Sequence, residues 1–265
     1  MNDRSGDEVA RESGVQGRNW DGIHLGYFSD PDAAAVLVSA VMAAVKAGAP
    51  DMLVDLGGGT GFLLREAVRS GLDPRIRTVN MDISARQIEA VERGRIEAVP
   101  GAVDAFRRSD FAAGNERILF LMRSVLHYLG RDGLFRGLCH IRSQMRAGEC
   151  FVHQTAVFAD ESAAACMSEL YAGLGTGKWF PARAFLADSL GKAGFRIESA
   201  ATAPALTLPS EELAARYGAD AGRIEKIRAG IASRFGEVAG VFESRGPDRG
   251  FVSCLHYAVY TCIAF

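Results

Sequence analysis

The sequence predicts an α/β fold, a doubly wound and mostly parallel sheet with helices on both faces. Apolar runs that suit buried strands alternate with helical patterns from Leu53 to about Ala156. The first run, residues 52–54, passes through a glycine-rich turn into the helical pattern of residues 62–68. The chain has 265 residues, 48% of them hydrophobic, which is enough to bury a large core. Since parallel strands need crossover connections, this alternation favours a parallel sheet.

The predicted elements follow one another in a regular order. The first five strands are expected at residues 52–54, 76–81, 103–107, 118–123 and 150–155. A helix of residues 181–192 precedes a sixth strand that begins at Phe195, and residues 251–265 form a long apolar closing strand. Before the first strand, Ser29, Asp30 and Pro31 are typical of a helix start and lead into an apolar helix of residues 33–45. This apolar stretch is too short to span a bilayer.

The turn after the first strand is the most informative segment of the chain. Gly57, Gly59 and Gly61 permit positive φ and leave room for a ligand to approach the backbone. The helix that follows offers free N–H groups at its N-terminus. The dinucleotide pattern G-x-G-x-x-G does not fit, because its third glycine falls on Phe62 or Leu64. An ordinary tight turn rarely needs four glycines in five positions, so we expect a cofactor loop.

An acidic residue, Asp82, ends the second predicted strand. It lies 21 residues after Gly61, the interval of about one helix and one strand. A carboxylate at this position can accept hydrogen bonds from both hydroxyls of a ribose. The alternative is a helix cap, but Ser84 can cap the next helix with Gln87 completing a capping box. The ribose role is therefore the preferred interpretation.

Residues 55–61 match D-x-G-x-G-x-G, which resembles the first motif of class I S-adenosylmethionine-dependent methyltransferases. The resemblance implies a Rossmann-like, doubly wound, seven-stranded sheet whose last strand is antiparallel, and S-adenosyl-L-methionine as cofactor. It implies that Asp55 orders the loop and binds the amino acid end of the cofactor. In this family an acid followed by an apolar residue after the third strand binds adenine, which here points to Asp110 and Phe111.

The segment after the fourth predicted strand resembles that of plant-type small-molecule O-methyltransferases, whose pattern is roughly Leu-His-Asp-Trp. Residues 54–61 are also closest to that group. The resemblance implies that His127 is the general base that deprotonates a hydroxyl, and that Arg123 lies near the cofactor. Tyr128 and Leu129 replace the Asp and Trp of the pattern. A histidine that only lines the pocket, or packs under the next helix, is therefore an equally open interpretation.

The chain is expected to divide into residues 1–50, a tail and helical lead-in, and residues 51–265, the methyltransferase domain. Two insertions interrupt the domain at about 158–180 and 209–247. The first combines glycines with aromatic residues and is predicted to be a lid over the substrate. The second is helical by pattern and fits a peripheral helical pair, a substrate cap or a dimer surface. Substrate-side candidates are Tyr27, His153, Tyr171 and Trp179, and Trp20 and His24 in the lead-in could also cover the site.

Composition narrows the partners that we expect. The net charge is −2, so nucleic acid and anionic membranes exert no strong attraction. The first residues are polar and carry no signal peptide, and the five cysteines show no CxxC spacing, which favours the cytoplasm. The predicted ends of strands four and five carry Arg123 and Gln154 rather than acids, so no metal is expected. The 50 residues before the first strand are too few for the plant-type dimerisation domain, so dimerisation by that route is not expected, and a homodimer formed in another way stays open.

The sequence therefore predicts a methyltransferase that acts on a small-molecule acceptor, with O-methylation preferred. The first alternative is a C- or N-methyltransferase in which His127 only orients the acceptor. The second is an NAD(P)-dependent oxidoreductase, and the third is a cofactor-binding protein without turnover. Binding of S-adenosylhomocysteine or of NADH distinguishes a methyltransferase from an oxidoreductase.

Overall fold

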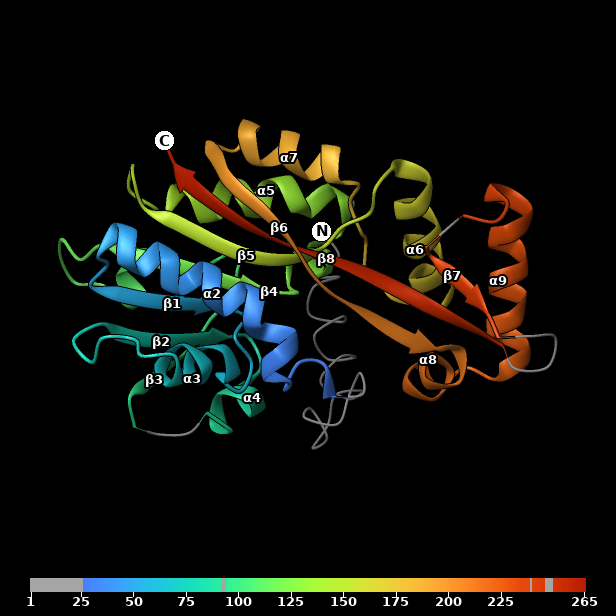
Figure 1. Cartoon of the computed structure of the whole chain (residues 1–265), viewed down its shortest axis with the longest axis horizontal. Coiled ribbons are helices and arrows are strands. Elements are labelled where there is room, and N and C mark those ends of the chain that lie inside the picture. The colour runs from blue at the N-terminus through green and yellow to red at the C-terminus, as the bar shows by residue number, and fades with distance from the viewer. Residues whose placement is uncertain (1–25, 92–93, 239, 246–249) are drawn as a thin grey trace.

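The computed structural model describes residues 26–91, 94–238, 240–245 and 250–265, and the described part is an α/β sheet covered by helices (Figure 1). The strand order is β3-β2-β1-β4-β5-β8-β6, and β7 pairs with β8. The strands are β1 (Met52–Leu56), β2 (Arg77–Asp82), β3 (Ile96–Pro100), β4 (Ile118–Arg123), β5 (Cys150–Ala156), β6 (Phe195–Pro209), β7 (Phe242–Ser244) and β8 (Phe251–Ala264). β1 to β5 are parallel, and β8 is antiparallel to β5 and β6. The α/β class and the antiparallel last strand are confirmed.

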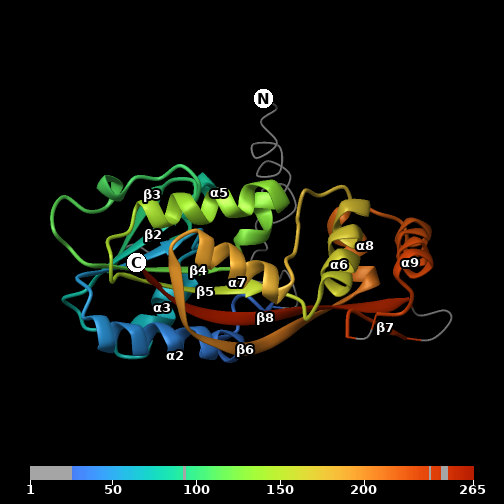
Figure 2. The ribbon, with the colours of Figure 1, turned by 90° about the horizontal axis from the view of Figure 1, so that it is seen from above.

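Helices cover both faces of the sheet, as predicted (Figure 2). On one face, α2 (Pro31–Gly48) and α3 (Phe62–Arg69) pack against the sheet, with Leu37 and Leu64 fully buried. On the other face lie α5 (Gly130–Ser143) and α7 (Arg183–Lys192), with Leu138 and Leu186 fully buried. Short helices fill the connections: α4 (Ala85–Glu89), η2 (Arg108–Asp110) and η3 (Leu126–Leu129). The strands run in one direction from β1 to β5, so the ends at Leu56, Asp82, Pro100, Arg123 and Ala156 share one side, here called the carboxyl edge.

Helix α2 begins where the sequence predicts it, because Asp30 caps it by accepting the N–H of Asp32, and Pro31 occupies its first turn. It is longer than expected. With 18 residues it is long and apolar enough to cross a membrane by length and composition alone. In the structure its buried side chains pack on the sheet and on α3.

The third strand was predicted in the wrong place. The sequence favoured residues 103–107, but β3 is Ile96–Pro100 and pairs with β2 from Thr78 onward. The predicted segment turns instead, since the N–H groups of Ala105 and Phe106 both donate to the Ala102 carbonyl. β3 is an edge strand in which only Ile96 is buried, so it lacks the apolar run that identified the other strands.

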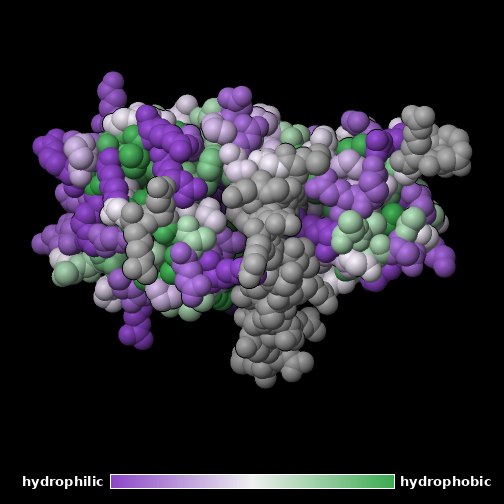
Figure 3. Space-filling view, turned by 90° about the horizontal axis from the view of Figure 1, so that it is seen from below, coloured by the Kyte–Doolittle hydropathy of each residue, from purple (hydrophilic) through white to green (hydrophobic). Residues whose placement is uncertain are grey.

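The two predicted insertions pack together into a second lobe, seen at the right of Figure 1. It contains α6 (Glu161–Gly173), α8 (Ser210–Tyr217), α9 (Ala221–Phe235) and β7, and it is joined to the sheet by the long strands β6 and β8. Helices α6 and α9 approach so closely that a Cβ on Gly173 would lie 2.9 Å from a side-chain carbon of Ile227. Arg223 also donates to the Gly173 carbonyl at 2.8 Å. On the face in Figure 3, hydrophilic side chains spread over both lobes and hydrophobic ones form small groups.

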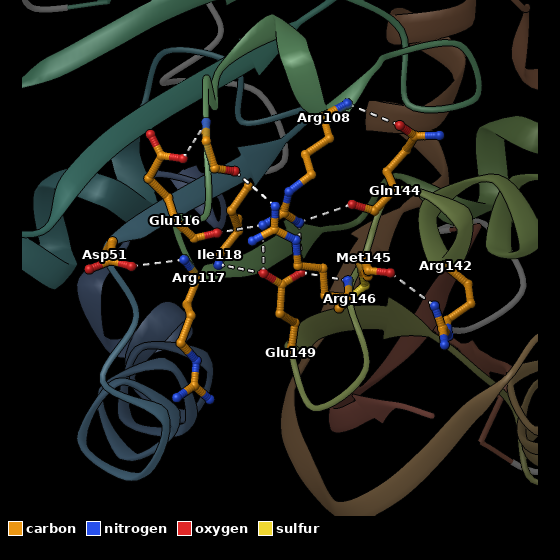
Figure 4. A network of polar contacts seen from close by, with 11 residues as sticks. Asp51, Arg108, Glu116, Arg117, Ile118, Arg142, Gln144, Met145, Arg146 and Glu149 are labelled. Carbon is orange, nitrogen blue, oxygen red and sulfur yellow. Dashed lines mark hydrogen bonds and ion pairs between the residues drawn. The ribbon is translucent and has the colours of Figure 1, made fainter.

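The opposite side of the sheet, here called the amino edge, is closed by a buried ion pair (Figure 4). Arg108 of η2 contacts Glu149, just before β5, at 2.7 Å, and the two side chains are 16% and 3% exposed. Glu149 also accepts the backbone N–H groups of Ile118 and Arg146, both at 2.8 Å. This network fastens the starts of β4 and β5 to η2.

Candidate cofactor and acceptor site

The glycine loop between β1 and α3 lies across the carboxyl edge. Gly57, Gly59 and Gly61 all have positive φ, at 74°, 57° and 77°. The N–H groups of Gly57 and Gly58 both donate to the Met81 carbonyl of β2. A Cβ on Gly58 would lie 2.1 Å from Asn80 Oδ1, a separation that real Cβ atoms essentially never show. A side chain at Gly58 is therefore excluded by steric contact, although the prediction did not include this residue.

Asp82 joins this loop to the end of β2. Its Oδ2 accepts the Gly59 N–H at 2.9 Å and its Oδ1 accepts the Ser84 N–H at 2.8 Å. The cap of α4 is Ser84, whose hydroxyl accepts the Gln87 N–H, as the sequence predicted. Burial raises the pKa of the Asp82 carboxyl, and the backbone donors oppose that rise. Asp82 is therefore free of the capping role and holds the glycine loop in place.

Asp55 is a fully buried carboxyl group at the end of β1. Within the described ranges, neither of its oxygens has a hydrogen-bond partner. Burial, together with repulsion from Asp82, raises its pKa to about 8, and Arg123 opposes the rise. Asn80, opposite Asp55 in the β1–β2 register, donates to the Gly59 carbonyl at 2.8 Å. Buried polar groups are nearly always paired, so this carboxyl lacks a donor that a ligand can supply.

Arg123 ends β4 and anchors the chain that precedes α2. Its guanidinium lies 5.2 Å from the ring centroids of both Tyr27 and Phe28. It also donates to the carbonyls of these two residues, at 3.3 and 3.2 Å. The side chain is 8% exposed, and burial lowers its pKa. Arg123 therefore places a buried cation beside Asp55 and the carboxyl edge.

Tyr27 is a buried anchor at the ends of β4 and β5. Its hydroxyl donates to the Pro204 carbonyl at 2.6 Å and accepts from Gln154 Nε2 at 3.0 Å. Its ring stacks on that of Tyr257 at 5.5 Å, and the Tyr257 hydroxyl lies 3.0 Å from Ser124 Oγ. Ser124 has a φ of 59°, which is unusual for a residue with a side chain and marks local strain. Trp20 and His24, which were also predicted to cover the site, lie outside the described residues.

His127 occupies the short helix η3 that follows β4. Its ring stacks on Phe180 at 5.3 Å and lies 4.2 Å from the Tyr128 ring. The residue is 6% exposed, and its Nδ1 has no hydrogen-bond partner among the residues that the structure describes. Burial, and then the cations Lys178 and Arg216, lower its pKa well below 6.5. The imidazole is therefore neutral at physiological pH and able to accept a proton.

Tyr171 and Trp179, the two predicted lid residues, make different ring contacts. Tyr171 of α6 contacts Phe180 at 5.1 Å and belongs to the same buried aromatic group as His127. Trp179 donates its backbone N–H to the His127 carbonyl, but its ring packs against Phe185 of α7 at 5.1 Å. Tyr171 is therefore the one that shares the surroundings of the His127 ring.

A buried lysine, Lys178, completes this part of the molecule. Its Nζ donates to the Tyr217 hydroxyl at 2.8 Å. The same ammonium lies 4.8 Å from the ring centroid of Tyr128 and 5.4 Å from those of Tyr171 and Tyr217. The sequence did not single out Lys178 or Tyr217, because the contributing residues come from η3, α6, the following loop and α8.

Asp110 and Phe111 are not where the sequence placed them, and their predicted role in adenine binding is withdrawn. Asp110 is the last residue of η2 and Phe111 follows it, on the amino side of the sheet, where the Phe111 carbonyl accepts from Arg77, the first residue of β2. The Phe111 ring is buried against Phe106 and Phe120. The error follows from the misplaced third strand. The chain that leaves β3 at the carboxyl edge begins with Gly101, whose N–H donates to the Asp82 carbonyl.

His153 is a core residue and is also withdrawn as a substrate contact. It is fully buried in β5 and lies between the rings of Phe151 and Tyr260, at 4.7 and 5.2 Å. Its Nδ1 lies 2.7 Å from Thr155 Oγ1. Burial lowers its pKa to about 3, so it is neutral at physiological pH.

The ends of β4 and β5 carry Arg123 and Ser124, and Gln154 and Thr155, rather than acids. In the described part of the chain, no three His, Cys, Asp or Glu side chains are grouped closely enough to hold a metal ion. That the protein uses no metal stays a prediction.

Comparison with known proteins identifies the fold. No protein-family model and no curated protein sequence matches the chain. A solved structure of a putative methyltransferase from Bacillus halodurans aligns with a TM-score of 0.64 and 12% identity, over 86% of this chain and 98% of that one. Geranyl diphosphate methyltransferase in complex with SAM aligns at 0.54 and 14%, over 88% and 85%. The [4+2]-cyclase SpnF aligns at 0.51 and 16%, over 86% and 80%. The chain therefore has the fold of SAM-dependent methyltransferases.

Proposed function

We propose that this protein is an S-adenosylmethionine-dependent methyltransferase that acts on a small-molecule acceptor. The observation that carries the proposal is the glycine loop on the carboxyl edge, beside the buried and unpartnered carboxyl of Asp55. Two further observations support it: the shared fold, and the presence of SAM in the geranyl diphosphate methyltransferase structure. A loop that needs glycine both for positive φ and for close packing is typical of a nucleotide-type site.

The residues at the carboxyl edge fit this cofactor. Asp55 offers a buried carboxyl group, whose ionised form the ammonium of the cofactor's amino acid part would stabilise. Asp82 has lone pairs left for the ribose hydroxyls after accepting from Gly59 and Ser84. The positive-φ backbone at Gly57, Gly59 and Gly61 lets the ligand approach closely, and Arg123 supplies a cation beside it. When bound, S-adenosylmethionine supplies an electrophilic methyl group.

His127 is proposed to take the acceptor's proton. A neutral imidazole with an unpartnered Nδ1 is able to accept it, and a positioned base typically contributes about 10²–10⁴-fold. O-methylation is preferred for this reason, and it agrees with the plant-type pattern around His127. If the acceptor atom is carbon or nitrogen, His127 orients the acceptor instead.

The [4+2]-cyclase with the same fold favours one further candidate, a cofactor-binding protein without methyl transfer. A screen of acceptors with methyl-labelled S-adenosylmethionine separates it from the proposed methyltransferase. An oxidoreductase is separated by thermal unfolding, because NADH would then raise the melting temperature and S-adenosylhomocysteine would not.

Calorimetry with S-adenosylhomocysteine tests the cofactor site. Gly59→Val places a side chain in the loop at a φ of 57° and should abolish binding. The matched control is Gly71→Val, because Gly71 also has positive φ, at 90°, has nothing within 4 Å of a Cβ and follows α3 at the other end of the helix. Unchanged affinity in a folded Gly59→Val protein would refute the assignment.

The cellular setting is part of the same proposal. All five cysteines are free thiols, which agrees with a reducing compartment such as the cytoplasm. One neighbour of this fold, a putative methyltransferase, is in complex with the Trm112 methyltransferase activator from Haloferax volcanii. A homodimer or a protein partner of this chain is tested by its mass in solution.

A further inference from the structure

Around His127 lies a group of buried and half-buried basic and phenolic side chains that the cofactor does not require. It is built from η3, from the loop after α6, from α6 and from α8, so it joins the sheet to the second lobe. We call it the acceptor cluster, and its members are His127, Tyr128, Tyr171, Lys178, Arg216 and Tyr217.

The position of the Lys178 ammonium in this cluster is closely defined. It is held by the Tyr217 hydroxyl at 2.8 Å and faces three tyrosine rings within 5.4 Å of their centroids. The residue is only 5% exposed. Tyrosine faces attract a cation, and the low dielectric of the interior strengthens its field. The fold therefore keeps a positive charge beside Tyr128, whose other neighbour is His127.

His127 has unused hydrogen-bonding capacity in this cluster. It is 6% exposed, and in the described ranges its Nδ1 has no partner. The charged groups described as acting on it, Lys178 and Arg216, are both cations. The Arg216 guanidinium lies 5.4 Å from the Tyr217 ring, so both cations share one aromatic side chain.

We propose that the acceptor cluster binds a carboxylate of the acceptor, an anionic group distinct from the hydroxyl that His127 deprotonates. The proposal deepens the function above and rests on it. The Lys178 ammonium and the Arg216 guanidinium attract such a carboxylate. They also repel a cationic acceptor, because like charges in a weakly screened interior raise the free energy of binding. The cluster then selects acidic acceptors.

Probes that differ only in charge can test this. Benzoate and benzamide are titrated into protein with ¹⁵N-labelled histidine, with and without S-adenosylhomocysteine, and the His127 signals are assigned with His127→Asn. We expect benzoate to shift the His127 signals and to bind about tenfold or more tightly than benzamide, as for a hydrogen bond to a charged group.

Removing each cation provides the matched comparison. Lys178→Met and Arg216→Met should each weaken benzoate binding by about tenfold or more, with the affinity for S-adenosylhomocysteine unchanged. Arg216 is half-buried on a helix, so its variant serves if Lys178→Met does not fold. Lys192→Met is the control, because Lys192 pairs with Asp188 on α7 and is 66% exposed.

Each remaining outcome decides against one specific proposal. Equal binding of benzoate and benzamide, no shift of His127 with either probe, or unchanged benzoate binding in the cation variants would overturn the anionic acceptor. Absence of S-adenosylhomocysteine binding to the wild-type protein would instead refute the methyltransferase. The probe titration without S-adenosylhomocysteine still reports on the cluster in that case.

Discussion

Glu149 at the amino edge of the sheet and Asp55 at its carboxyl edge are both buried acids, but only Glu149 is surrounded by donors. Glu149 accepts two bonds from the Arg108 guanidinium and two from backbone N–H groups (Figure 4). Among the described residues, Asp55 accepts none, and its pKa rises to about 8. The same chain thus satisfies one buried acid completely and leaves the other without partners.

Two histidines show the same contrast. His140 of α5 lies toward the amino edge, and its Nε2 is 2.9 Å from the Phe106 carbonyl. His127 lies past the carboxyl edge, and its Nδ1 has no partner in the part of the chain that the structure describes. Satisfied buried polar groups hold a fold together, whereas unsatisfied ones cost free energy and persist where a ligand repays it. For these four groups, the partnered ones lie toward the amino edge and the unpartnered ones at or past the carboxyl edge, which agrees with a ligand site at the carboxyl edge.

The largest expected effect concerns His127, which lies past the carboxyl edge. If His127 is the base, His127→Ala should lower kcat by about two to four orders of magnitude, with little change in cofactor affinity. Because the pKa of His127 lies well below 6.5, its imidazole stays neutral until the pH falls well below that value. The wild-type rate should therefore fall only at such low pH. His140→Ala is the control and should lower stability without a comparable loss of kcat. Near-normal turnover in His127→Ala would leave His127 as pocket lining.

Glu149→Gln removes the buried ion pair at the amino edge. This change leaves Arg108 buried without its counter-charge and should cost about 3–5 kcal/mol of unfolding free energy, measured by urea denaturation. Glu97→Gln is the matched control, because its pair with Arg77 is exposed and worth about 0–1 kcal/mol. Equal losses in the two variants would show that burial does not distinguish the ion pairs.

The sequence identified the parts of the site that local patterns determine. The glycine loop follows an apolar strand, and the acids Asp55 and Asp82 lie at the ends of two such strands. Strand periodicity and glycine spacing were enough to place all three features. Ser84 was identified as a cap for the same reason, since a cap depends on residues within one turn. These features require no knowledge of how distant segments pack.

Features that depend on tertiary packing escaped prediction. β3 is a largely exposed edge strand that is held by pairing with β2, so its own sequence shows only a weak strand pattern. Asp110 was misplaced because the third strand was. Lys178 and Tyr217 are 39 positions apart and meet only because α6 and α8 share one lobe. His153 looked like a site residue because a polar side chain in a strand gives no sign of which ring will cover it.

The pH dependence of stability in Asp55→Asn tests whether the buried Asp55 carboxyl lacks partners. The folded pKa of about 8 lies above the ordinary value of 3.8, so the carboxyl's contribution to stability is full below about pH 4 and is lost as the pH rises to 8. The ligand-free variant should match the wild-type protein near pH 4 and exceed it by on the order of a few kcal/mol at pH 8. Urea denaturation across this range measures the gap.

Asp73→Asn is the control for this pH series. Arg75 lowers the pKa of the exposed Asp73 carboxyl to about 2, so its contribution is lost only as the pH falls below 4. A stability gap for Asp55→Asn that stays constant from pH 4 to 8 would show that Asp55 is paired in solution.

The smallest of these effects separates binding from local structure at the end of β2. Asp82→Ala should weaken S-adenosylhomocysteine binding by about 1.5–3 kcal/mol, since hydrogen bonds to a charged group are lost. Ser84→Ala removes the cap of the adjacent α4 and should cost about 1 kcal/mol of stability with cofactor affinity retained. Calorimetry and urea denaturation on both variants give the two quantities. If Asp82→Ala lowers stability while the affinity for S-adenosylhomocysteine is unchanged, then Asp82 only holds Gly59 and Ser84 in place. Its role at the carboxyl edge would then be structural, like that of Glu149 at the amino edge.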